Sequence, residues 1–302
     1  MADLPAYVII TPARNEAEFI ELTLKSVVAQ TVKPIKWVIV SDGSTDGTDE
    51  IVSGYAAQYP WIELVRMPER RERHFAGKVY AFNAGYSRVK ELDYAVIVSM
   101  DADISFEGDY FAFLLARLAA DSRLGIVGTR FREGELTYDF RFSSTDHVSG
   151  ACQMFHRLCF ESIGGYQPLK SGGIDVTAVL SASAKGWQTR TFTEKSCVHH
   201  RKMGTAQYAG YRARLNIGHK DYLLGSHPVW EVFRCIYQMR QKPYVIGGTL
   251  IAAAYFWDLL RGVERSMPDD LIQFRQKDQM SRLKSFFSRA VHASPRLSSG
   301  RE

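Results

Sequence analysis

The chain has 302 residues, of which 46% are apolar and 24% are charged. Since domains usually hold roughly 100–200 residues, this length predicts one large domain or a core with an appendage, and the composition excludes a disordered protein. The start, MADLPAYVII, has no basic region before its short apolar run, so we expect no signal peptide. The four cysteines lack C-x-x-C spacing, which favours neither a zinc knuckle nor a disulfide framework and predicts a reducing, cytoplasmic setting.

Short apolar runs alternate with longer amphipathic stretches through the first 120 residues. We expect strands at 7–11, 37–41, 62–67 and 94–100, followed in turn by helices at 15–30, 45–58, 77–90 and 106–120. This alternation predicts an α/β fold with a mostly parallel, doubly wound sheet and helices on both faces. In such sheets ligands bind beyond the carboxyl ends of the strands, so the polar residues there are the candidates for a site.

The remainder of the chain becomes less regular and then helical. Further strands are expected at 124–131, 136–142 and 187–193, with a helix at 175–186. From about residue 204 helical patterning dominates, and the expected helix boundaries are marked by prolines at positions 228, 243 and 268. We therefore expect two domains, 1–205 and a helical C-terminal extension over 206–302.

The C-terminal extension is basic and contains the most hydrophobic segment. Residues 226–302 hold twelve Lys or Arg against seven Asp or Glu, which leaves residues 1–225 neutral. Either solvated helical faces or an acidic partner such as anionic lipid explains this charge. Segment 244–257 has 14 uncharged residues, fewer than the roughly 20 needed to cross a bilayer, so it is a core helix or a membrane-surface helix.

Acidic residues follow two of the predicted strands. Asp101 and Asp103 come at the end of the strand ending in MDAD, and side chains at i and i+2 share one face of a strand. Two carboxylates that close repel each other unless a cation lies between them, and such oxygen ligands suit Mg²⁺ or Mn²⁺. Asp42, in SDGSTDGT, can accept hydrogen bonds from a ribose or a base edge, or it can stabilise its own turn.

The first strand runs into TPARNE, where Asn15 is expected to cap the following helix. The amides at the start of that helix favour phosphate or another polar ligand. This half of the chain has no G-x-G-x-x-G motif and no Walker lysine motif. A dinucleotide-dependent oxidoreductase and a P-loop NTPase are therefore poorly supported.

In their order and spacing, TPARNE, SDGSTDGT, GKVYAFNAGY and MDAD resemble the family 2 glycosyltransferases, which have the GT-A fold. The resemblance continues through GACQMFHRLCFESIGGY, GGIDVTAVLSASAKGW and CVHHRKMGT, and covers roughly residues 5–205. The region beyond is similar to the C-terminal extension of bacterial or archaeal surface-polysaccharide members.

The resemblance also implies roles for individual residues. It implies a donor-nucleotide site formed by Thr11, Pro12, Arg14, Asn15, Glu16, Asp42, Lys78, Asn83 and Asp101. It implies that Asp103 binds a Mg²⁺ or Mn²⁺ ion together with His199, for which His200 is the substitute. It implies Asp175 as the catalytic base, although the preceding acid of the family's pair is Ile174 here, and it places His156 and Arg157 on the acceptor side.

These roles predict a metal-dependent hexosyltransferase that moves a sugar from a nucleotide-diphosphate donor to a hydroxyl acceptor in polysaccharide or glycolipid assembly. A cation stabilises the leaving diphosphate and one carboxylate takes the proton of the acceptor, which implies single displacement with inversion. A retaining route would need a second carboxylate as nucleophile. The alternatives are a sugar-1-phosphate nucleotidyltransferase, whose Gly-rich opening loop TPARNE lacks, and a catalytically inactive nucleotide-sugar-binding module.

Processive polysaccharide synthases of the family carry Q-x-x-R-W and several membrane spans. The nearest string here, Gln279 to Leu283, lacks the Trp, so we expect one sugar to be transferred per encounter. The basic, apolar extension makes a lipid-linked acceptor and a peripheral position at the inner face of the plasma membrane our working hypothesis. We expect no nucleic-acid partner.

Overall fold

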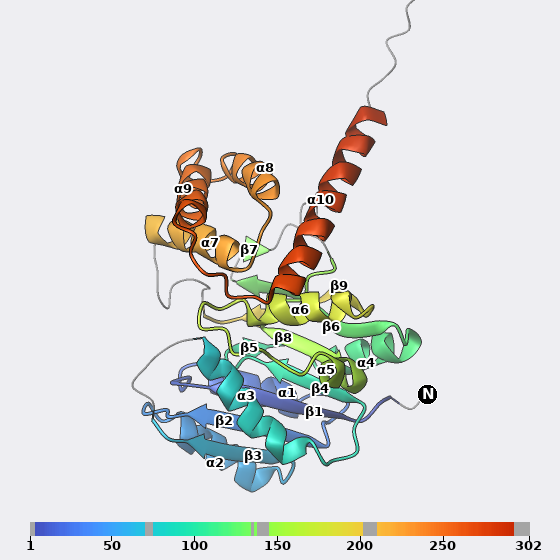
Figure 1. Ribbon diagram of the computed structural model, residues 1–302. Helices are drawn as coiled ribbons and strands as arrows, with labels where there is room; N and C mark the ends of the chain where they lie inside the picture. The colour runs from blue at the N-terminus through green and yellow to red at the C-terminus, as the bar shows by residue number, and fades with distance from the viewer. Residues whose placement is uncertain (1–3, 70–74, 134–135, 138–144, 202–209, 293–302) are drawn as a thin grey trace, which may run out of the picture. The chain divides into compact units, whose positions relative to one another are not determined.

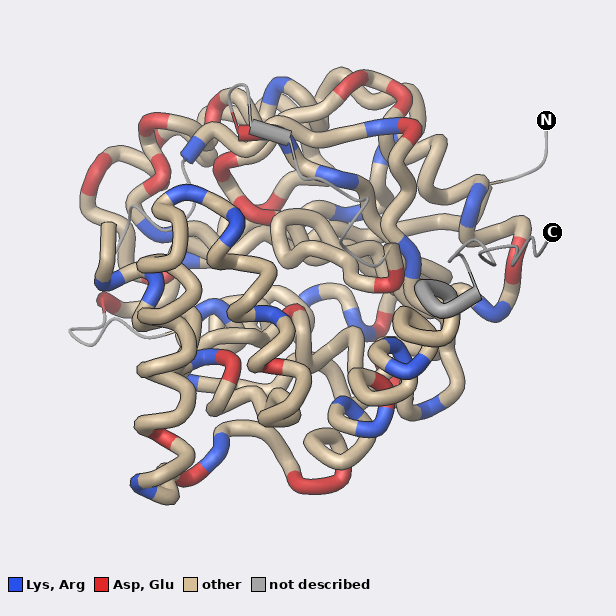
Figure 2. Tube along the Cα trace, turned by 90° about the horizontal axis from the view of Figure 1, so that it is seen from above, with Lys and Arg blue, Asp and Glu red and all other residues tan. Residues whose placement is uncertain are grey.

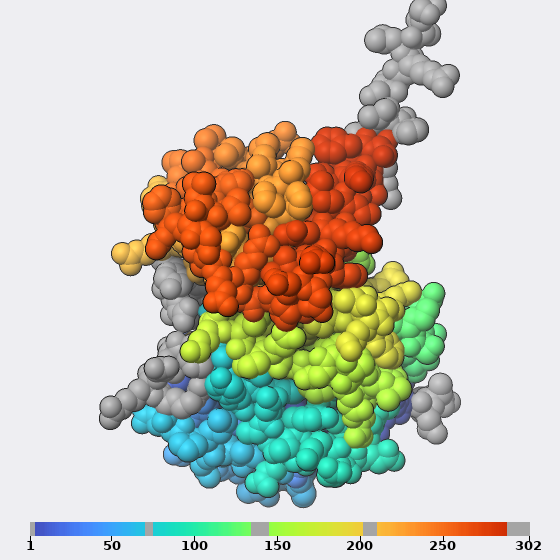
Figure 3. Space-filling model, in the orientation of Figure 1, coloured from blue at the N-terminus to red at the C-terminus, as the bar shows by residue number. Residues whose placement is uncertain are grey.

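The computed structural model describes residues 4–69, 75–133, 136–137, 145–201 and 210–292 (Figure 1). The chain divides into two compact units, Met1–Ala206 and Gln207–Glu302. The first unit runs from blue to yellow and the second from orange to red in the ribbon and space-filling views (Figures 1 and 3).

Within the described residues, the first unit is built on one nine-stranded sheet with the order β3-β2-β1-β4-β8-β6-β9-β5, in which β7 pairs with β6. The strands are β1 (Tyr7–Ala13), β2 (Lys36–Asp42), β3 (Ile62–Met67), β4 (Val96–Met100), β5 (Ile104–Ser105), β6 (Leu124–Glu133), β7 (Leu136–Thr137), β8 (Cys152–His156) and β9 (Gln188–His199). Strands β1 to β4 are parallel, as are β6 and β9, whereas β8 is antiparallel to both of its neighbours. The predicted, mostly parallel sheet is confirmed.

Helices cover both faces of this sheet, as predicted. They are α1 (Ile20–Val28), α2 (Thr48–Gln58), α3 (Ala76–Val89), α4 (Tyr110–Ala120), α5 (Arg157–Ser162) and α6 (Ile174–Ala184). Successive strand residues point to opposite faces, so Ile9 packs in one core with α1, α2 and α4, while Ile10 packs in the other with α3, α5 and α6. The strands are apolar on both sides because both faces are buried.

Several elements differ from the sequence-based expectation. The helix expected from residue 15 begins at Ile20, and β9 extends to His199 instead of ending at 193. Strand β8 was not predicted at all. Of the strand expected at 136–142, Leu136 and Thr137 form β7, and residues 138–142 lie outside the described part of the chain.

The second unit is helical, with α7 (Tyr211–Leu223), α8 (Pro228–Gln238), α9 (Ile246–Arg261) and α10 (Asp269–His292). The three prolines lie at helix starts, as predicted: Pro228 is the first residue of α8, and the other two precede α9 and α10. Among the described helices, none is long and apolar enough to cross a membrane. Helix α9 is partly a core helix, because Ile251 and Tyr255 are fully buried while Trp257 and Leu260 are exposed.

The packing of α3 on the sheet predicts that Gly85→Ala destabilises the protein. A Cβ at Gly85 would lie 2.7 Å from Cγ2 of Ile10 and 3.0 Å from Cγ2 of Val40, both buried and β-branched. We expect the free energy of unfolding in urea to fall by about 1–3 kcal/mol, as for other overpacked cores. Gly54, in α2, has open space around it, so Gly54→Ala should leave stability unchanged or raise it by about 0.5–1 kcal/mol. Equal losses in the two variants would contradict this packing.

Candidate functional site

The polar residues that follow β1, β2 and β4 lie at one edge of the sheet. These strands are parallel and adjacent, with Ala13 opposite Ser41 and Ile10 opposite Ser99. Their carboxyl ends therefore meet, and this brings Asp42, the last residue of β2, to the same edge as Arg14 and Asp101, which follow β1 and β4. The N-terminal turn of α3 carries Lys78 to the same edge, where its ammonium forms an ion pair with Asp101.

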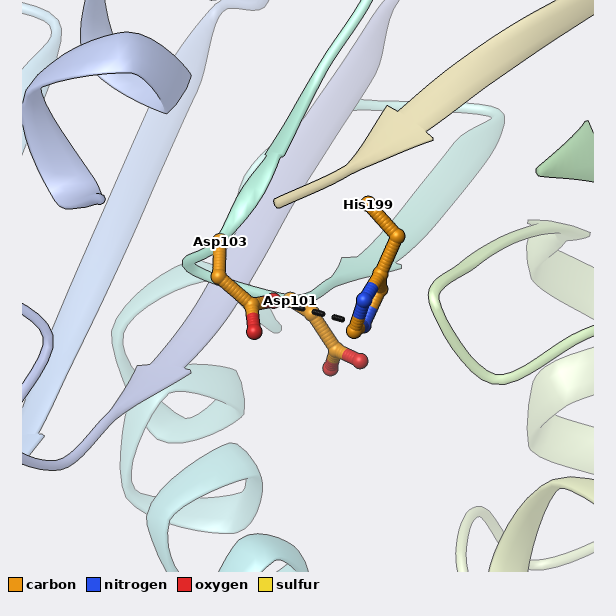
Figure 4. A group of neighbouring side chains, drawn as sticks. All are labelled: Asp101, Asp103 and His199. Carbon is orange, nitrogen blue, oxygen red and sulfur yellow. Dashed lines mark ion pairs between the residues drawn. The ribbon is translucent and has the colours of Figure 1, made fainter. Parts of the chain in front are cut away.

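Asp101, Asp103 and His199 form a candidate metal site (Figure 4). Strand β5 pairs with β9 so that Ile104 is opposite His199, which brings the imidazole beside Asp103. One possible ligand atom from each of the three residues lies within 4.8 Å of the others, and Nε2 of His199 is 3.6 Å from Oδ1 of Asp103. Two carboxylates and one imidazole form a ligand set that fits Mn²⁺. The two carboxylates also suit Mg²⁺, which prefers oxygen ligands.

The surroundings of His199 leave one of its ring nitrogens available. Nδ1 contacts the carbonyl oxygen of Arg201 and lies 3.5 Å from Oε1 of Glu133, so we assign the proton to this nitrogen. The lone pair of Nε2 then faces Asp103, an arrangement typical of a metal-bound histidine. His200 is placed differently, since its Nε2 lies 2.9 Å from Oγ of Ser105 and its ring stacks on Phe19. The structure thus brings His199, and not His200, to the two aspartates.

Asp175 lies in the first turn of α6 and approaches the same group through the backbone of Gly150. The amide of Gly150 donates to Oδ2 of Asp175 at 3.2 Å, and its carbonyl accepts from Nζ of Lys78 at 3.3 Å. Burial works against the charged Lys78, but the carboxylates of Asp101 and Asp175 outweigh it and raise the pKa of this lysine. Lys78 therefore stays positively charged between the two acids.

A side chain at Gly150 would also lie in tight contact with Asp175. A Cβ at this position would lie 3.0 Å from Cβ of Asp175 and 3.2 Å from its Cγ and Oδ2. The next residue, Ala151, accepts a 2.9 Å hydrogen bond from the amide of Asp101. This short segment before β8 therefore fixes Asp101 and Asp175 together. Our sequence analysis did not select Gly150, although the run of small residues in GACQ was a signal for such a close approach.

A second ion-paired group, Arg201 with Glu16, lies beside the candidate metal ligands. Nη2 of Arg201 lies 2.5 Å from Oε2 of Glu16, and Nε of Arg201 lies 3.4 Å from Oδ2 of Asp103. Burial, together with the negative charge of Asp103, raises the pKa of Glu16 to about 7 despite the nearby guanidinium. The contact of Arg201 with Asp103 places a positive charge next to the candidate metal ligands.

The loops after β1 and β2 are tied together by side chains. Oδ1 of Asn15 accepts from the amide of Thr45 at 2.8 Å, and the amide of Glu16 donates to Oγ1 of Thr48 at 2.8 Å. The predicted capping role of Asn15 is wrong, because α1 begins five residues later with Phe19 at its N-cap. Asn15 instead has a left-handed backbone with φ +56°, which Asn tolerates better than most residues.

The remaining predicted donor-site residues of this region have structural partners. Nη1 of Arg14 lies 3.8 Å from Oδ2 of the buried Asp42. The hydroxyl of Thr11 is buried and accepts from Nε1 of Trp37 at 2.9 Å. Pro12 lies in β1 opposite Val40.

Three predicted residues lie elsewhere. His156 pairs with Val96 at the start of β4, while the acids follow its end, so about 13 Å of strand separates them. Arg157, the next residue, donates to the carbonyls of Leu92 and Lys90. The expectation that these two shape the acceptor side does not fit this geometry. Asn83 is exposed on α3, and no contact among the described residues joins it to the acids.

Comparisons with known proteins agree with this reading of the fold. The family model described as "Glycosyl transferase family 2" matches residues 8–177, which is more than half of the chain. Over 135 residues the chain is 31% identical to the probable glycosyltransferase YdaM of Bacillus subtilis, covering 44% of this chain and 31% of that protein. Over 113 residues it is 31% identical to a poly-β-1,6-N-acetyl-D-glucosamine synthase of Staphylococcus aureus, covering 37% of this chain and 25% of the synthase. The matched part is thus less than a third of either relative.

Solved structures share the fold at low sequence identity. The mannosyltransferase PcManGT from Pyrobaculum calidifontis, in complex with GDP-Man and Mn²⁺, superposes with a TM-score of 0.59 at 20% identity, covering 96% of this chain and 81% of that one. TarS 1–349 of S. aureus, in complex with UDP-GlcNAc, has a TM-score of 0.55 at 12% identity, covering 83% and 71%. With its Asp-x-Asp pair at the carboxyl edge of a mostly parallel sheet, this chain belongs to the family 2 glycosyltransferases and has the GT-A fold.

Proposed function

We propose that the chain transfers a single hexosyl unit from a nucleotide-diphosphate donor to a hydroxyl acceptor, with inversion, using a divalent cation. The observation that carries this proposal is the convergence of Asp101, Asp103 and His199 with Asp175, through Lys78 and Gly150, at one edge of the sheet. Complexes of PcManGT with GDP-Man and Mn²⁺ and of TarS with UDP-GlcNAc support a nucleotide-sugar donor and a metal.

In this proposal Asp101, Asp103 and His199 hold Mg²⁺ or Mn²⁺, which would supply positive charge to the departing diphosphate. Arg201, next to Asp103, adds a second positive charge on the same side. Arg14, Asn15, Glu16 and Asp42 border the nucleoside end of the donor. The carboxylate of Asp175 accepts the proton of the acceptor hydroxyl during its attack.

Inversion is inferred from the acids of the site, and single-sugar transfer from the sequence of α10. Asp175 is the one carboxylate we assign as base, and the other acids of the group are ion-paired or belong to the metal ligands. The segment from Gln279 to Leu283 lies in α10 and has no Trp, which argues against a processive synthase. The synthase of S. aureus among the relatives supports a role in polysaccharide or glycolipid assembly.

We further propose that residues 1–205 form the catalytic domain and that 206–302 bring it to a lipid-linked acceptor at an anionic membrane surface, at the inner face of the plasma membrane. The basic composition of the extension supports this assignment.

The proposed base predicts that Asp175→Asn abolishes transfer while donor binding is kept. We expect kcat to fall by about 10²–10⁴-fold, the usual contribution of a general base, because the amide cannot take a proton. Transfer from radiolabelled nucleotide sugars to a water-soluble acceptor measures turnover, and calorimetry measures donor affinity. Asp121→Asn, which changes a half-exposed acid paired with Arg123 and placed after α4, should behave as wild type. Wild-type turnover in Asp175→Asn would exclude this residue as the base.

The metal site predicts that Asp103→Asn and His199→Ala each weaken Mn²⁺ binding. Each change removes one ligand, so we expect the Kd to rise at least about tenfold, or about 1.4 kcal/mol. Electron paramagnetic resonance of free Mn²⁺ measures this binding without a turnover assay. His200→Ala is the matched control, because that ring contacts Ser105 and Phe19, and its Kd should be unchanged. A larger effect at His200 than at His199 would reverse the assignment.

The close approach at Gly150 predicts that Gly150→Ala lowers kcat without raising the KM for the donor. The added methyl would contact the Asp175 side chain at 3.0–3.2 Å and displace its carboxyl slightly, so we expect a loss of rate smaller than the roughly 10²-fold that a misplacement of about 1 Å can cause. Gly54→Ala introduces the same group into open space and should keep the wild-type rate. A parallel rise in KM would show that the donor site, and not the base, was disturbed.

A further inference from the structure

Helix α8 of the second unit exposes an apolar stripe. Val229, Val232, Phe233 and Ile236 follow the spacing i, i+3, i+4 and i+7, and each has 39–47% of its surface exposed. The opposite side of the helix is buried at Glu231 and Cys235. We call these four exposed side chains the α8 face. Their spacing places them on one side of the helix, so they form one continuous strip.

Aromatic residues of α10 extend the α8 face. The ring of Phe287 packs edge-on against Phe233, with 5.2 Å between centroids, and Phe286 packs against Phe287. Both phenylalanines are themselves exposed, Phe286 by 66%. An apolar stripe joined to exposed aromatic rings is more than the scattered apolar residues found on any protein surface.

The exposed charged residues that directly follow α8 are positive. No acidic residue occurs between Glu231 and Asp258, whereas Arg240 and Lys242 are both exposed just after the helix. Arg240 is the second residue after α8, which ends at Gln238, and so lies near the C-terminal end of the stripe. Lys284 lies on α10 next to the exposed phenylalanines and is also exposed. In the trace of Figure 2 the two charge signs are otherwise interspersed along the chain.

We propose that the α8 face, with Arg240 and Lys242, docks on a membrane surface that contains anionic lipid. Apolar side chains enter the boundary between headgroups and acyl chains, and the two cations meet lipid phosphates. A second copy of this chain fits less well, because an isologous contact pairs this face with itself and so supplies no acidic partner for the two cations. The inference rests on the membrane part of the proposed function. It assigns the contact to α8.

The proposal is tested by co-sedimentation of the full chain with lipid vesicles. Wild type should bind vesicles of phosphatidylcholine and phosphatidylglycerol, and bind phosphatidylcholine alone at least about tenfold more weakly. The triple variant Val232→Ser, Phe233→Ser and Ile236→Ser should lose binding by at least about tenfold. Arg240→Glu with Lys242→Glu should lose binding to the mixed vesicles specifically.

The matched control changes Leu22, Ile35 and Leu92 to Ser. These side chains have similar exposure, 38–44%, but lie on the first unit, so vesicle binding should be kept. Equal binding by the α8 triple variant and wild type overturns the proposal. So does a wild-type dimer in analytical ultracentrifugation that the triple variant dissociates.

Turnover with a water-soluble acceptor separates this inference from the transferase chemistry. The α8 triple variant should keep wild-type turnover there while losing vesicle binding. Loss of both would overturn the separate docking role of α8. If an Asp175→Asn protein binds vesicles and keeps normal turnover, the proposed base is wrong. The docking role of the α8 face is then still supported.

Discussion

Repulsion between carboxylates is the constraint on which the candidate site depends. Asp101 and Asp103 follow a buried strand, and Glu16 reaches the same edge from β1. These three acids can lie close together only if positive charges lie between them. Without such charges, the buried carboxylates would raise one another's pKa and destabilise the fold. Lys78 and Arg201 provide two cations, and the geometry leaves a place for a third.

This constraint explains why backbone hydrogen bonds hold several of the charged residues in place. Gly150 holds Lys78 through its carbonyl and Asp175 through its amide, while Ala151 holds Asp101. Backbone groups keep their geometry without side-chain freedom, so the distances between the acids are set by where β4 and β8 pair. The antiparallel β8 is therefore as important to the site as the parallel strands that precede it.

The sequence predicted the parallel strands well because Val and Ile dominate runs such as WVIVS, which suit strands buried on both faces. It also predicted the acids at the strand ends. It did not predict β8, since CQMFH is short and Gln153 interrupts its apolar run, although that amide is fully buried and accepts from Tyr166. Without β8 there was no way to see that His156 lies at the opposite end of β4 from the acids. Pairing partners distant in sequence, such as Ile104 and His199, leave no local pattern.

The hydrogen bonds between the loops after β1 and β2 would affect the entropy of nucleotide binding. Asn15 and Glu16 are held by Thr45 and Thr48, so the walls of that part of the edge are set when the chain folds. Little conformational entropy is then lost when a base and ribose arrive. In the proposed donor complex the pyrophosphate end differs, because Arg201 is ion-paired with Glu16 and Asp103 and would exchange partners as an anion enters. The proposed recognition would thus combine a rigid part that selects by shape with an ionic part that rearranges.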